Sequence, residues 1–329
     1  MKIAIDVMGG DYAPKELVTG ARSYIELGGE ASLILVGNES AIRETLQELP
    51  SNCEIYHTDE VVDMGESPLS ALRKKKNASV AVAARLVREG KADAFLSAGS
   101  TGAQMAASLL EMGRIPGIER PAISVMLPSG GETGVLLLDV GANVDVRASH
   151  LVQFAVMGSA YFEKICGVKN PKVGLLSVGE EEGKGNELTK AAFPLLKSES
   201  RINFIGNIEA DNLYYGKAHV VVCDGFAGNV LLKASESVSE LIQGTLFKAA
   251  MAAEITPEKL QAIKKGLKKY SPDSPEYSGA PLLGLNGVSI VCHGNSKAHV
   301  ISNAITLAEN CAKTDFINLI KQNLSEAIE

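Results

Sequence analysis

The sequence has 329 residues, of which 46% are hydrophobic and 22% are charged, and its formal net charge is −7. An acidic chain argues against a broad nucleic-acid-binding surface, because such a surface needs clustered positive charge. The five cysteines form no CxxC pair, so a reduced cytosolic protein is predicted rather than a disulfide framework or a zinc site.

The N-terminus shows no signal peptide, since Met1 and Lys2 lead directly into the strand-like run IAIDV. The apolar runs are far shorter than the ~18 residues that a membrane-spanning helix needs. We therefore expect a soluble chain that can still touch a membrane surface.

Seven segments share one pattern: a short Val/Ile/Leu run, a Gly/Ser/Asn/Asp loop, then a segment with helical periodicity. Continuous apolar runs are typical of strands covered on both faces, and strands that alternate with helices predict a mostly parallel sheet. No low-complexity linker divides the chain, so we predict a single two-lobed unit over residues 1–329, with ligands beyond the carboxyl ends of the strands. The seven segments are KIAIDVMGGD (2–11), ASLILVGNES (31–40), ADAFLSAGSTG (92–102), GVLLLDVGAN (134–143), KVGLLSVGEEEGKGN (172–186), AHVVVCDGFAGN (218–229) and VSIVCHGNSKAH (288–299).

The first charged feature in chain order is a run of four basic residues before the helical segment ASVAVAARLVREG. These residues are Arg73, Lys74, Lys75 and Lys76. They are suited to docking an acidic partner, and a solvated helix face is the other interpretation.

The loop SAGSTG, residues 97–102, lies between a predicted strand and a predicted helix. Its glycines let backbone N–H groups approach a ligand, Ser100 and Thr101 add hydroxyl donors, and the helix N-terminus carries positive partial charge. The pattern predicts phosphate or carboxylate binding by Ser100, Thr101 and Gly102. Helix capping by Ser100 or Thr101 uses the same geometry and stays an alternative.

Two further loops carry an amide or an ammonium group. LLLDVGAN contains Asp139 and ends in Asn143. GEEEGKGNE contains Lys184 between two glycines, and Asn186 follows the second glycine. A lysine between glycines can approach a ligand closely as a compact charged donor; the alternative is a solvated turn. The second loop is one residue short of a P-loop and lacks its Ser/Thr, so nucleotide binding loses its usual support.

The stretch VVVCDGFAGNVLLKASE, residues 220–236, combines an acid, an amide and a cation near a helix start. Asp224, Asn229 and Lys233 are therefore candidates for binding an anionic substrate, although Asp224 is equally plausible as a turn former.

Residues 240–275 are predicted to form a protruding basic amphipathic hairpin. Its apolar edge would contain Leu246, Phe247 and Met251, and its lysines would face anionic head groups. An ordinary surface helix or a dimer contact is the alternative. The lysines are Lys264, Lys265 and Lys268.

Cys292 and His293 are adjacent on a predicted strand end, so their side chains point to opposite faces and are poorly placed as a thiol–base pair. We interpret Cys292 as a buried structural residue, and His293 as a candidate for lining the site.

Taken in order, these loops resemble the bacterial acyl-acyl-carrier-protein:phosphate acyltransferase family of phospholipid synthesis. The resemblance covers essentially the whole chain, and seven fragments that are each weak alone are specific together. The matching fragments are IDVMGGDYAP (5–14), AGSTGA (98–103), LLDVGAN (137–143), GEEEGKGNE (179–187), CDGFAGNVLLK (223–233), GAPLLGLNG (279–287) and CHGNS (292–296).

The resemblance implies that inorganic phosphate attacks the thioester of a long-chain acyl-[acyl-carrier protein], reversibly giving acyl phosphate in the first step towards phosphatidic acid. It implies a three-layer αβα fold with a mostly parallel central sheet and two intertwined lobes, similar to isopropylmalate dehydrogenase and phosphate acetyltransferases. It also implies a homodimer on the inner face of the cell membrane, delivery of acyl phosphate to a membrane glycerol-3-phosphate acyltransferase, and no metal or organic cofactor.

The residue types agree with this chemistry, which needs positioning and preorganised donors more than a nucleophilic triad. Our hypothesis is that Asn229 and the Gly228 backbone donate to phosphate or to the thioester oxygen, that Lys184 neutralises phosphate, and that Asp224 orients a donor or accepts a proton. The residues expected to bind substrate around them are Ser100, Thr101, Gly102, Asn143, Asn186, Gly228, Lys233 and His293.

Two other functions stay open from the sequence. A phosphate acetyltransferase-like enzyme would use acyl-coenzyme A and would need an adenine-nucleotide pocket instead of a basic docking face. A non-catalytic membrane-surface scaffold would need only the basic amphipathic region.

Overall fold

The computed structural model describes residues 1–131, 133–270, 274 and 278–325. Within these residues, eleven strands form one sheet in the order β3-β2-β1-β4-β11-β10-β5-β6-β9-β7-β8. The strands are β1 (Lys2–Asp6), β2 (Ser32–Gly37), β3 (Cys53–His57), β4 (Ala94–Ser97), β5 (Ala122–Leu127), β6 (Val135–Leu138), β7 (Lys172–Leu176), β8 (Asn203–Ile208), β9 (Val220–Val222), β10 (Ala280–Leu283) and β11 (Val288–Val291).

The sheet joins two lobes whose strands run in opposite directions. In the first lobe β3, β2, β1, β4 and β11 are parallel, and in the second β6, β9, β7 and β8 are parallel. Between them, β11–β10, β10–β5 and β5–β6 are antiparallel pairs. Because the strand direction reverses three times, the carboxyl ends of the strands in one lobe lie at the opposite side of the sheet from those in the other lobe. Each of these two lines of strand ends is called an edge below. The chain also returns from the second lobe to the first through β10 and β11, so the lobes are intertwined as predicted.

The inner strands are mostly apolar because both faces of the sheet are covered there, whereas the outermost strands β3 and β8 carry polar residues and are partly exposed. In β1, Ile3 and Ile5 enter one hydrophobic core, and Ala4 enters the other. In β6, Leu136 contacts the first core and Leu137 the second. This two-residue period on two buried faces produces the predicted three layers.

Helices flank the sheet on both faces. Helices α1, α6 and α10 contribute to the first core, and helices α4 and α5, with Leu232 from α8, contribute to the second. The helices are α1 (Lys15–Glu26), α2 (Glu39–Leu46), α3 (Pro68–Lys74), α4 (Ser79–Arg88), α5 (Thr101–Glu111), α6 (Ala148–Cys166), α7 (Glu187–Ser198), α8 (Gly225–Ala252), α9 (Pro257–Leu267), α10 (Ala298–Lys313) and α11 (Phe316–Ser325), with short 3₁₀ turns at Ala210–Tyr215 and Lys268–Tyr270.

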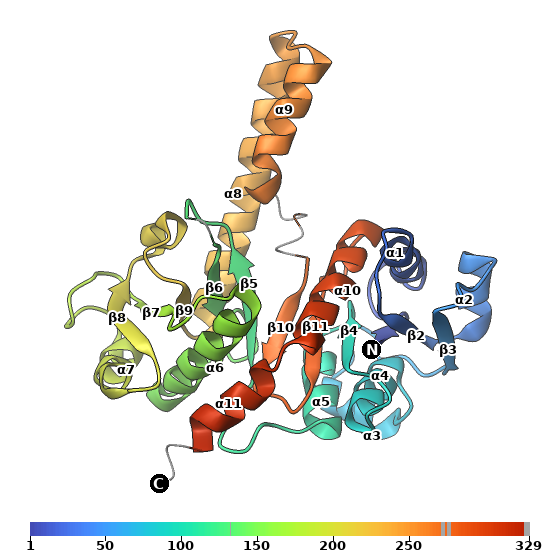
Figure 1. Cartoon of the computed structure of the whole chain (residues 1–329), viewed down its shortest axis with the longest axis horizontal. Helices are drawn as coiled ribbons and strands as arrows, with labels where there is room; N and C mark the ends of the chain where they lie inside the picture. Colours follow the sequence, from blue (N-terminus) through green and yellow to red (C-terminus); the bar gives the residue numbers. More distant parts are fainter. Residues whose placement is uncertain (132, 271–273, 275–277, 326–329) are drawn as a thin grey trace.

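Helices α8 and α9 lie side by side and project from the body of the molecule (Figure 1, orange). Helix α8 is 28 residues long, or about 42 Å at 1.5 Å per residue. It begins at Gly225, inside the second lobe, well before the hairpin predicted from residue 240. Residues 271–273 and 275 of that predicted hairpin lie outside the described residues. No helix in the described part of the chain has the length and apolar character needed to cross a bilayer.

Candidate active site

The first group of candidate residues follows the parallel strands β1, β4 and β11 of the first lobe. Buried Asp6, at the end of β1, accepts a hydrogen bond of 2.7 Å from the Ser97 hydroxyl at the end of β4. Ser97 Oγ in turn accepts the Gly99 N–H at 3.0 Å. Burial raises the pKa of Asp6, while the hydrogen bonds to Ser97 and neighbouring groups partly offset this rise. The pair fixes the loop that leads into α5.

That loop caps α5 in the way the sequence allowed. The Ser100 hydroxyl accepts the Ala103 N–H at 3.4 Å, so Ser100 is the N-cap of α5. Thr101 and Gly102 are exposed in the first turn, and within the described residues no hydrogen bond uses the Thr101 hydroxyl. Capping and anion binding are compatible here, because the Thr101 hydroxyl and the helix N-terminus are left for a ligand.

His293 lies at the same edge. β11 pairs with β4 so that Val291 stands beside Ser97, and the Cys292 N–H donates to the Ser97 carbonyl at 2.9 Å. His293 follows directly and its side chain is half exposed. Ser100, Thr101, Gly102 and His293 are thus brought to neighbouring loops.

A second group follows strands β6, β9 and β7 at the opposite edge. The Asp139 carboxylate is fully buried and accepts hydrogen bonds from a ring of donors around the loop after β6. The donors are the backbone N–H groups of Ile123, Gly141, Ala142 and Asn143 and the side-chain amide of Asn143, at 2.7–3.1 Å. Burial raises the pKa of Asp139, and these donors oppose the rise.

Asn143 belongs to the scaffold of this loop as well as to the predicted substrate site. Its amide nitrogen donates to both Asp139 and the Pro121 carbonyl at 2.8 Å, and the residue is buried. Its backbone carbonyl accepts the Gly225 N–H at 2.8 Å. Asn143 therefore ties the loop after β6 to the start of α8.

The start of α8 packs against the Asp139 loop so closely that only glycine fits. A Cβ added at Gly228 would stand 1.9 Å from the Asp139 carbonyl oxygen, and one at Gly225 would stand 2.5 Å from the Asn143 carbonyl oxygen. Asp224 is the N-cap, accepting the Ala227 N–H at 2.8 Å. The two glycines and the acid in CDGFAG thus seat α8 on the loop.

Two predicted donors at this edge are available for a ligand. Asn229 and Lys184 are both exposed, and among the described residues neither side chain enters a hydrogen bond or an ion pair. Asn229 lies against Gly141, since a Cβ added at that glycine would stand 3.7 Å from Asn229 Oδ1. Asn186, in contrast, uses its side-chain oxygen to cap α7 by accepting the Thr189 N–H at 2.9 Å.

Helix α8 connects the two edges through a stripe of polar side chains. Asn229, Lys233 and Glu236 are spaced by four and three residues, which places them on one helix face. Lys233 Nζ is 2.7 Å from Glu236 Oε2, and His293 Nε2 is 3.6 Å from Glu236 Oε1. Burial would raise the pKa of Glu236, but the hydrogen bonds and charges of His293 and Lys233 together outweigh it and lower that pKa.

The structure therefore divides the predicted site residues between two edges and joins them by one helix. Sequence reasoning missed Glu236, which touches both Lys233 and His293. Its signal was present as an acid three residues after Lys233 on a helix, but the contact with His293 depends on the fold. The buried carboxylates of Asp6 and Asp139 organise the loops that carry the candidate residues.

The cysteines at the strand ends are structural, as predicted for Cys292. Cys223 and Cys292 are both buried, and burial raises the pKa of Cys292 to about 12. Such thiols are poor nucleophiles because they stay protonated. No group of three or more His, Cys, Asp or Glu side chains within the described residues is arranged to hold a metal ion.

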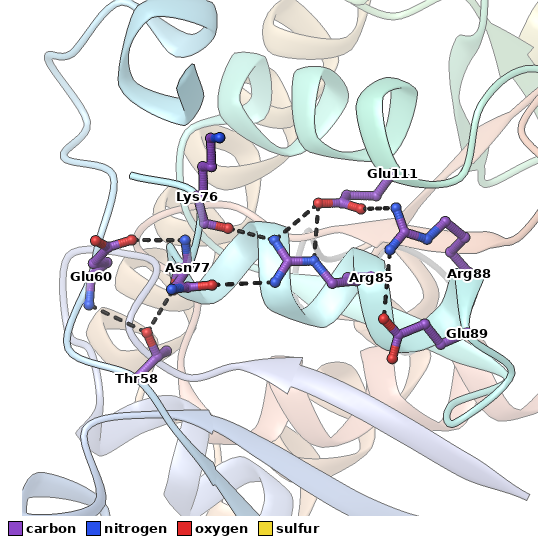
Figure 2. A network of polar contacts seen from close by, with 8 residues as sticks. All are labelled: Thr58, Glu60, Lys76, Asn77, Arg85, Arg88, Glu89 and Glu111. Atoms are coloured by element: carbon purple, nitrogen blue, oxygen red, sulfur yellow. Dashed lines mark hydrogen bonds and ion pairs between the residues drawn. The ribbon is translucent and has the colours of Figure 1, made fainter. Parts of the chain in front are cut away.

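The basic segment before α4 is held by an ion-pair network, which Figure 2 shows. Arg85 donates to the Lys76 carbonyl at 2.5 Å, to Asn77 Oδ1 at 3.3 Å and to Glu111 Oε1 at 3.2 Å. Arg88 pairs with the other oxygen of Glu111 at 2.5 Å. In the figure the Lys76 side chain points away from this network, so its backbone is anchored and its ammonium group is presented outward.

The other basic residues of this segment differ from one another. Arg73 and Lys74 are exposed and form no ion pair within the described residues. Lys75 is half-buried and donates at 2.7 Å to both the Val61 carbonyl and Glu66. The hydrogen bond to Glu66 raises the pKa of Lys75, and the lysine is already paired.

The predicted membrane-contact residues lie on the projecting helices. Leu246 and Met251 are exposed on α8, at 38% and 73%. Phe247 is partly covered, since Lys264 Nζ of α9 lies 5.5 Å from its ring centroid. Lys265 and Lys268 are exposed.

Residues 1–319 match the sequence model of a family described as fatty acid synthesis protein. A phosphate acyltransferase from Desulfitobacterium hafniense is 51% identical over 98% of this chain and 98% of its own length. A phosphate acyltransferase from Heliobacterium modesticaldum is 49% identical over 100% of this chain and 99% of its own.

Solved structures with a similar fold have low sequence identity. The EutD phosphotransacetylase from Staphylococcus aureus matches with a TM-score of 0.60 and 19% identity, covering 95% of this chain and 94% of its own. A branched-chain phosphotransacylase from Enterococcus faecalis matches with a TM-score of 0.61 and 16% identity, covering 95% and 99%. A 4-hydroxythreonine-4-phosphate dehydrogenase from Klebsiella pneumoniae gives 0.53 and 14%, covering 95% and 99%. These likenesses confirm the predicted fold class.

Proposed function

We propose that the acyl donor is a long-chain acyl-[acyl-carrier protein], because the chain belongs to the fatty acid synthesis protein family. Its relatives with about 50% sequence identity are phosphate acyltransferases, so the chain is an acyltransferase. The acceptor is inorganic phosphate, and the acyl phosphate product is the first intermediate towards phosphatidic acid. The observation that carries the proposal is the full-length family match. The unpartnered Asn229 amide and Lys184 ammonium at one loop edge, free of partners among the described residues, agree with it.

The reaction is a direct displacement. A phosphate oxygen forms a bond to the thioester carbonyl carbon while the C=O π pair moves onto oxygen as an oxyanion; when the C=O bond forms again, the carbon–sulfur bond breaks and its electron pair leaves on sulfur. The thiol has a pKa near ~8.5, so the thiolate leaves readily and takes a proton from water. The barrier lies in bringing an anion to the carbonyl and in stabilising the oxyanion, where one well-placed donor contributes about 3–4 kcal/mol.

The proposed roles follow from which groups are free. The Asn229 side chain donates to phosphate or to the developing oxyanion, and Lys184 neutralises phosphate. Asp224 holds the start of α8 in place beside them and orients these donors. The Gly228 N–H, also predicted as a donor, is not free, because it donates to the Asp224 carbonyl at 3.0 Å inside α8; Gly228 instead lets α8 pack against the Asp139 loop. Lys233, Glu236 and His293 continue the polar stripe towards the helix start at Ser100, Thr101 and Gly102, which holds an anion by its N–H groups. Asn143 and Asn186 position the loops that carry these donors.

The carrier protein is proposed to dock on the basic segment before α4. Arg73, Lys74 and Lys76 offer three cations without ion pairs in the described structure, and an acidic carrier complements them. Lys75 acts there as the anchor of the segment, through Val61 and Glu66. We further propose that the enzyme is a homodimer that associates with the inner face of the cell membrane through the α8–α9 hairpin and passes acyl phosphate to a membrane glycerol-3-phosphate acyltransferase.

Phosphate-dependent loss of thioester tests the donor. Palmitoyl-carrier protein and palmitoyl-coenzyme A are supplied at equal concentration, and acyl phosphate is trapped with hydroxylamine as the hydroxamate. We expect kcat/KM at least tenfold higher with the carrier protein. A preference for palmitoyl-coenzyme A would indicate a phosphate acetyltransferase-like enzyme. If neither thioester were lost in a phosphate-dependent way, the result would favour a non-catalytic membrane-surface scaffold.

Flotation with lipid vesicles tests the membrane contact. Replacing Leu246 and Phe247 together by glutamate places two anions on the predicted apolar edge of α8, where Leu246 is exposed and Phe247 is partly covered, so we expect the variant to lose most of its flotation with vesicles rich in phosphatidylglycerol. Leu27→Glu is the matched control, since Leu27 is 81% exposed on the first lobe, far along the chain from the hairpin. Equal flotation of all three proteins would contradict a role for the hairpin.

A further inference from the structure

An apolar groove lies at the base of the hairpin, between α8, α9 and the end of β5. Its volume is about 520 Å³, within the range of ~300–1,000 Å³ that small-molecule sites occupy. Its walls are mostly apolar side chains, and no motif in the sequence indicates a role for it. The walls include Leu127, Tyr214, Leu232, Val238, Ile242 and Leu267.

The groove runs beside the polar stripe of α8. Leu232, Ser239 and Ile242 line the groove at spacings of seven and three residues, so they form a second stripe on the helix. That stripe is adjacent to the one formed by Asn229, Lys233 and Glu236. Glu236 lines the groove as well, so the two stripes meet at its carboxylate.

At Glu236, one of the residues that line the groove, polar groups from α8 and from the loop after β11 meet. Lys233 Nζ is 2.7 Å and His293 Nε2 is 3.6 Å from the Glu236 carboxylate. His293 follows β11, beside the loop that opens α5. The groove therefore has an apolar body and, at Glu236, a polar rim next to the candidate anion site.

We propose that this groove binds the fatty acyl chain of the substrate, with the phosphate or thioester head at the rim where Glu236 meets Lys233 and His293. The inference rests on the proposed function and adds the place of the acyl chain. An amphiphile with a long apolar tail and a polar head matches both the apolar walls and the ammonium and imidazole groups at the rim. A flat protein partner would bury about 800 Å² on each side, whereas a concave channel of this volume is suited to a slender chain.

Chain length gives the measurable signature. Burial of each methylene group strengthens binding about fourfold, so a blocked groove penalises long chains and spares short ones. Ala234 is exposed and lines the groove, which makes Ala234→Trp a blocking change that the fold accommodates. Ala249→Trp is the matched control, on the same helix and exposed but outside the groove.

The experiment measures turnover of palmitoyl- and butyryl-carrier protein and, independently, binding of decyl and butyl phosphate by calorimetry. For Ala234→Trp we expect the KM for palmitoyl-carrier protein and the dissociation constant of decyl phosphate to rise at least tenfold. The butyryl and butyl values should stay within twofold, and Ala249→Trp should match the wild type throughout.

The outcomes separate this inference from the proposed function. If Ala234→Trp lost decyl phosphate binding while the wild type consumed no thioester, the result would support the groove and contradict the proposed reaction. Normal turnover with an unchanged chain-length profile in Ala234→Trp would overturn the groove. A change of oligomeric state on sedimentation, with the profile unchanged, would overturn it as well and assign the groove to a second copy of the chain.

Discussion

Replacing Gly228 by alanine should strongly destabilise the protein and nearly abolish turnover. The added Cβ would stand 1.9 Å from the Asp139 carbonyl oxygen and 2.9 Å from Cys223 Sγ, and the oxygen belongs to backbone that cannot rotate away. Helix α8 would have to move away from the Asp139 loop. Overpacking of this kind should lower the free energy of unfolding by about 3 kcal/mol. Denaturant unfolding followed by circular dichroism gives the free energy of unfolding, and the same samples give kcat.

Gly244→Ala is the matched control for that change. Gly244 lies in the same helix, and a Cβ there would meet nothing within 4 Å. Alanine should therefore stabilise the protein by up to about 1 kcal/mol, because it has the higher helix propensity. If both variants unfolded at the same denaturant concentration, the close seating of α8 on the loop would be wrong.

Replacing Asn229 by alanine should lower kcat by about 10²-fold while leaving the unfolding transition unchanged. The loss of one preorganised oxyanion donor typically costs ~10²–10³ in kcat. The side chain is exposed, and no hydrogen bond in the described part of the chain depends on it, so a loss of activity cannot be attributed to unfolding. Steady-state rates at saturating phosphate and thioester measure the effect.

Replacing Lys184 by alanine should lower turnover at least tenfold and raise the KM for phosphate, because this lysine is proposed to neutralise the phosphate. Asn318→Ala, at an exposed position of α11, is the control and should match the wild type. Near-normal kcat in Asn229→Ala or in Lys184→Ala would remove that residue from the site.

The division of the site between two edges changes how its parts can cooperate. Ser100 and His293 lie at the carboxyl edge of the first lobe, and Asn229 and Lys184 belong to the opposite edge. Among the described elements, α8 reaches from one to the other, since its N-cap is Asp224 and its third turn brings Glu236 to His293. Asn229, the proposed donor to phosphate, and Lys233 and Glu236 at the polar rim of the groove are therefore held on one helix.

Much of the local structure was predictable from the sequence alone. Apolar runs such as VVV at 220–222 become strands, and the polar residue after the strand becomes a cap, as Ser100, Asn186 and Asp224 show. These features depend on the propensities of neighbouring residues and on hydrogen bonds over three positions. The glycines of CDGFAGN could likewise be recognised as sites of close approach.

Only the tertiary structure decided which loops meet. Three antiparallel pairings in the middle of the sheet reverse the second lobe, and nothing in the individual strand sequences encodes that reversal. The contact between Glu236 and His293, and the hydrogen bond from the Gly225 N–H to the Asn143 carbonyl, follow from packing between segments distant in the chain. Such contacts depend on the summed burial of whole faces, whereas capping and strand patterns depend on a few adjacent residues, so the sequence determined the pieces and long-range packing determined the site.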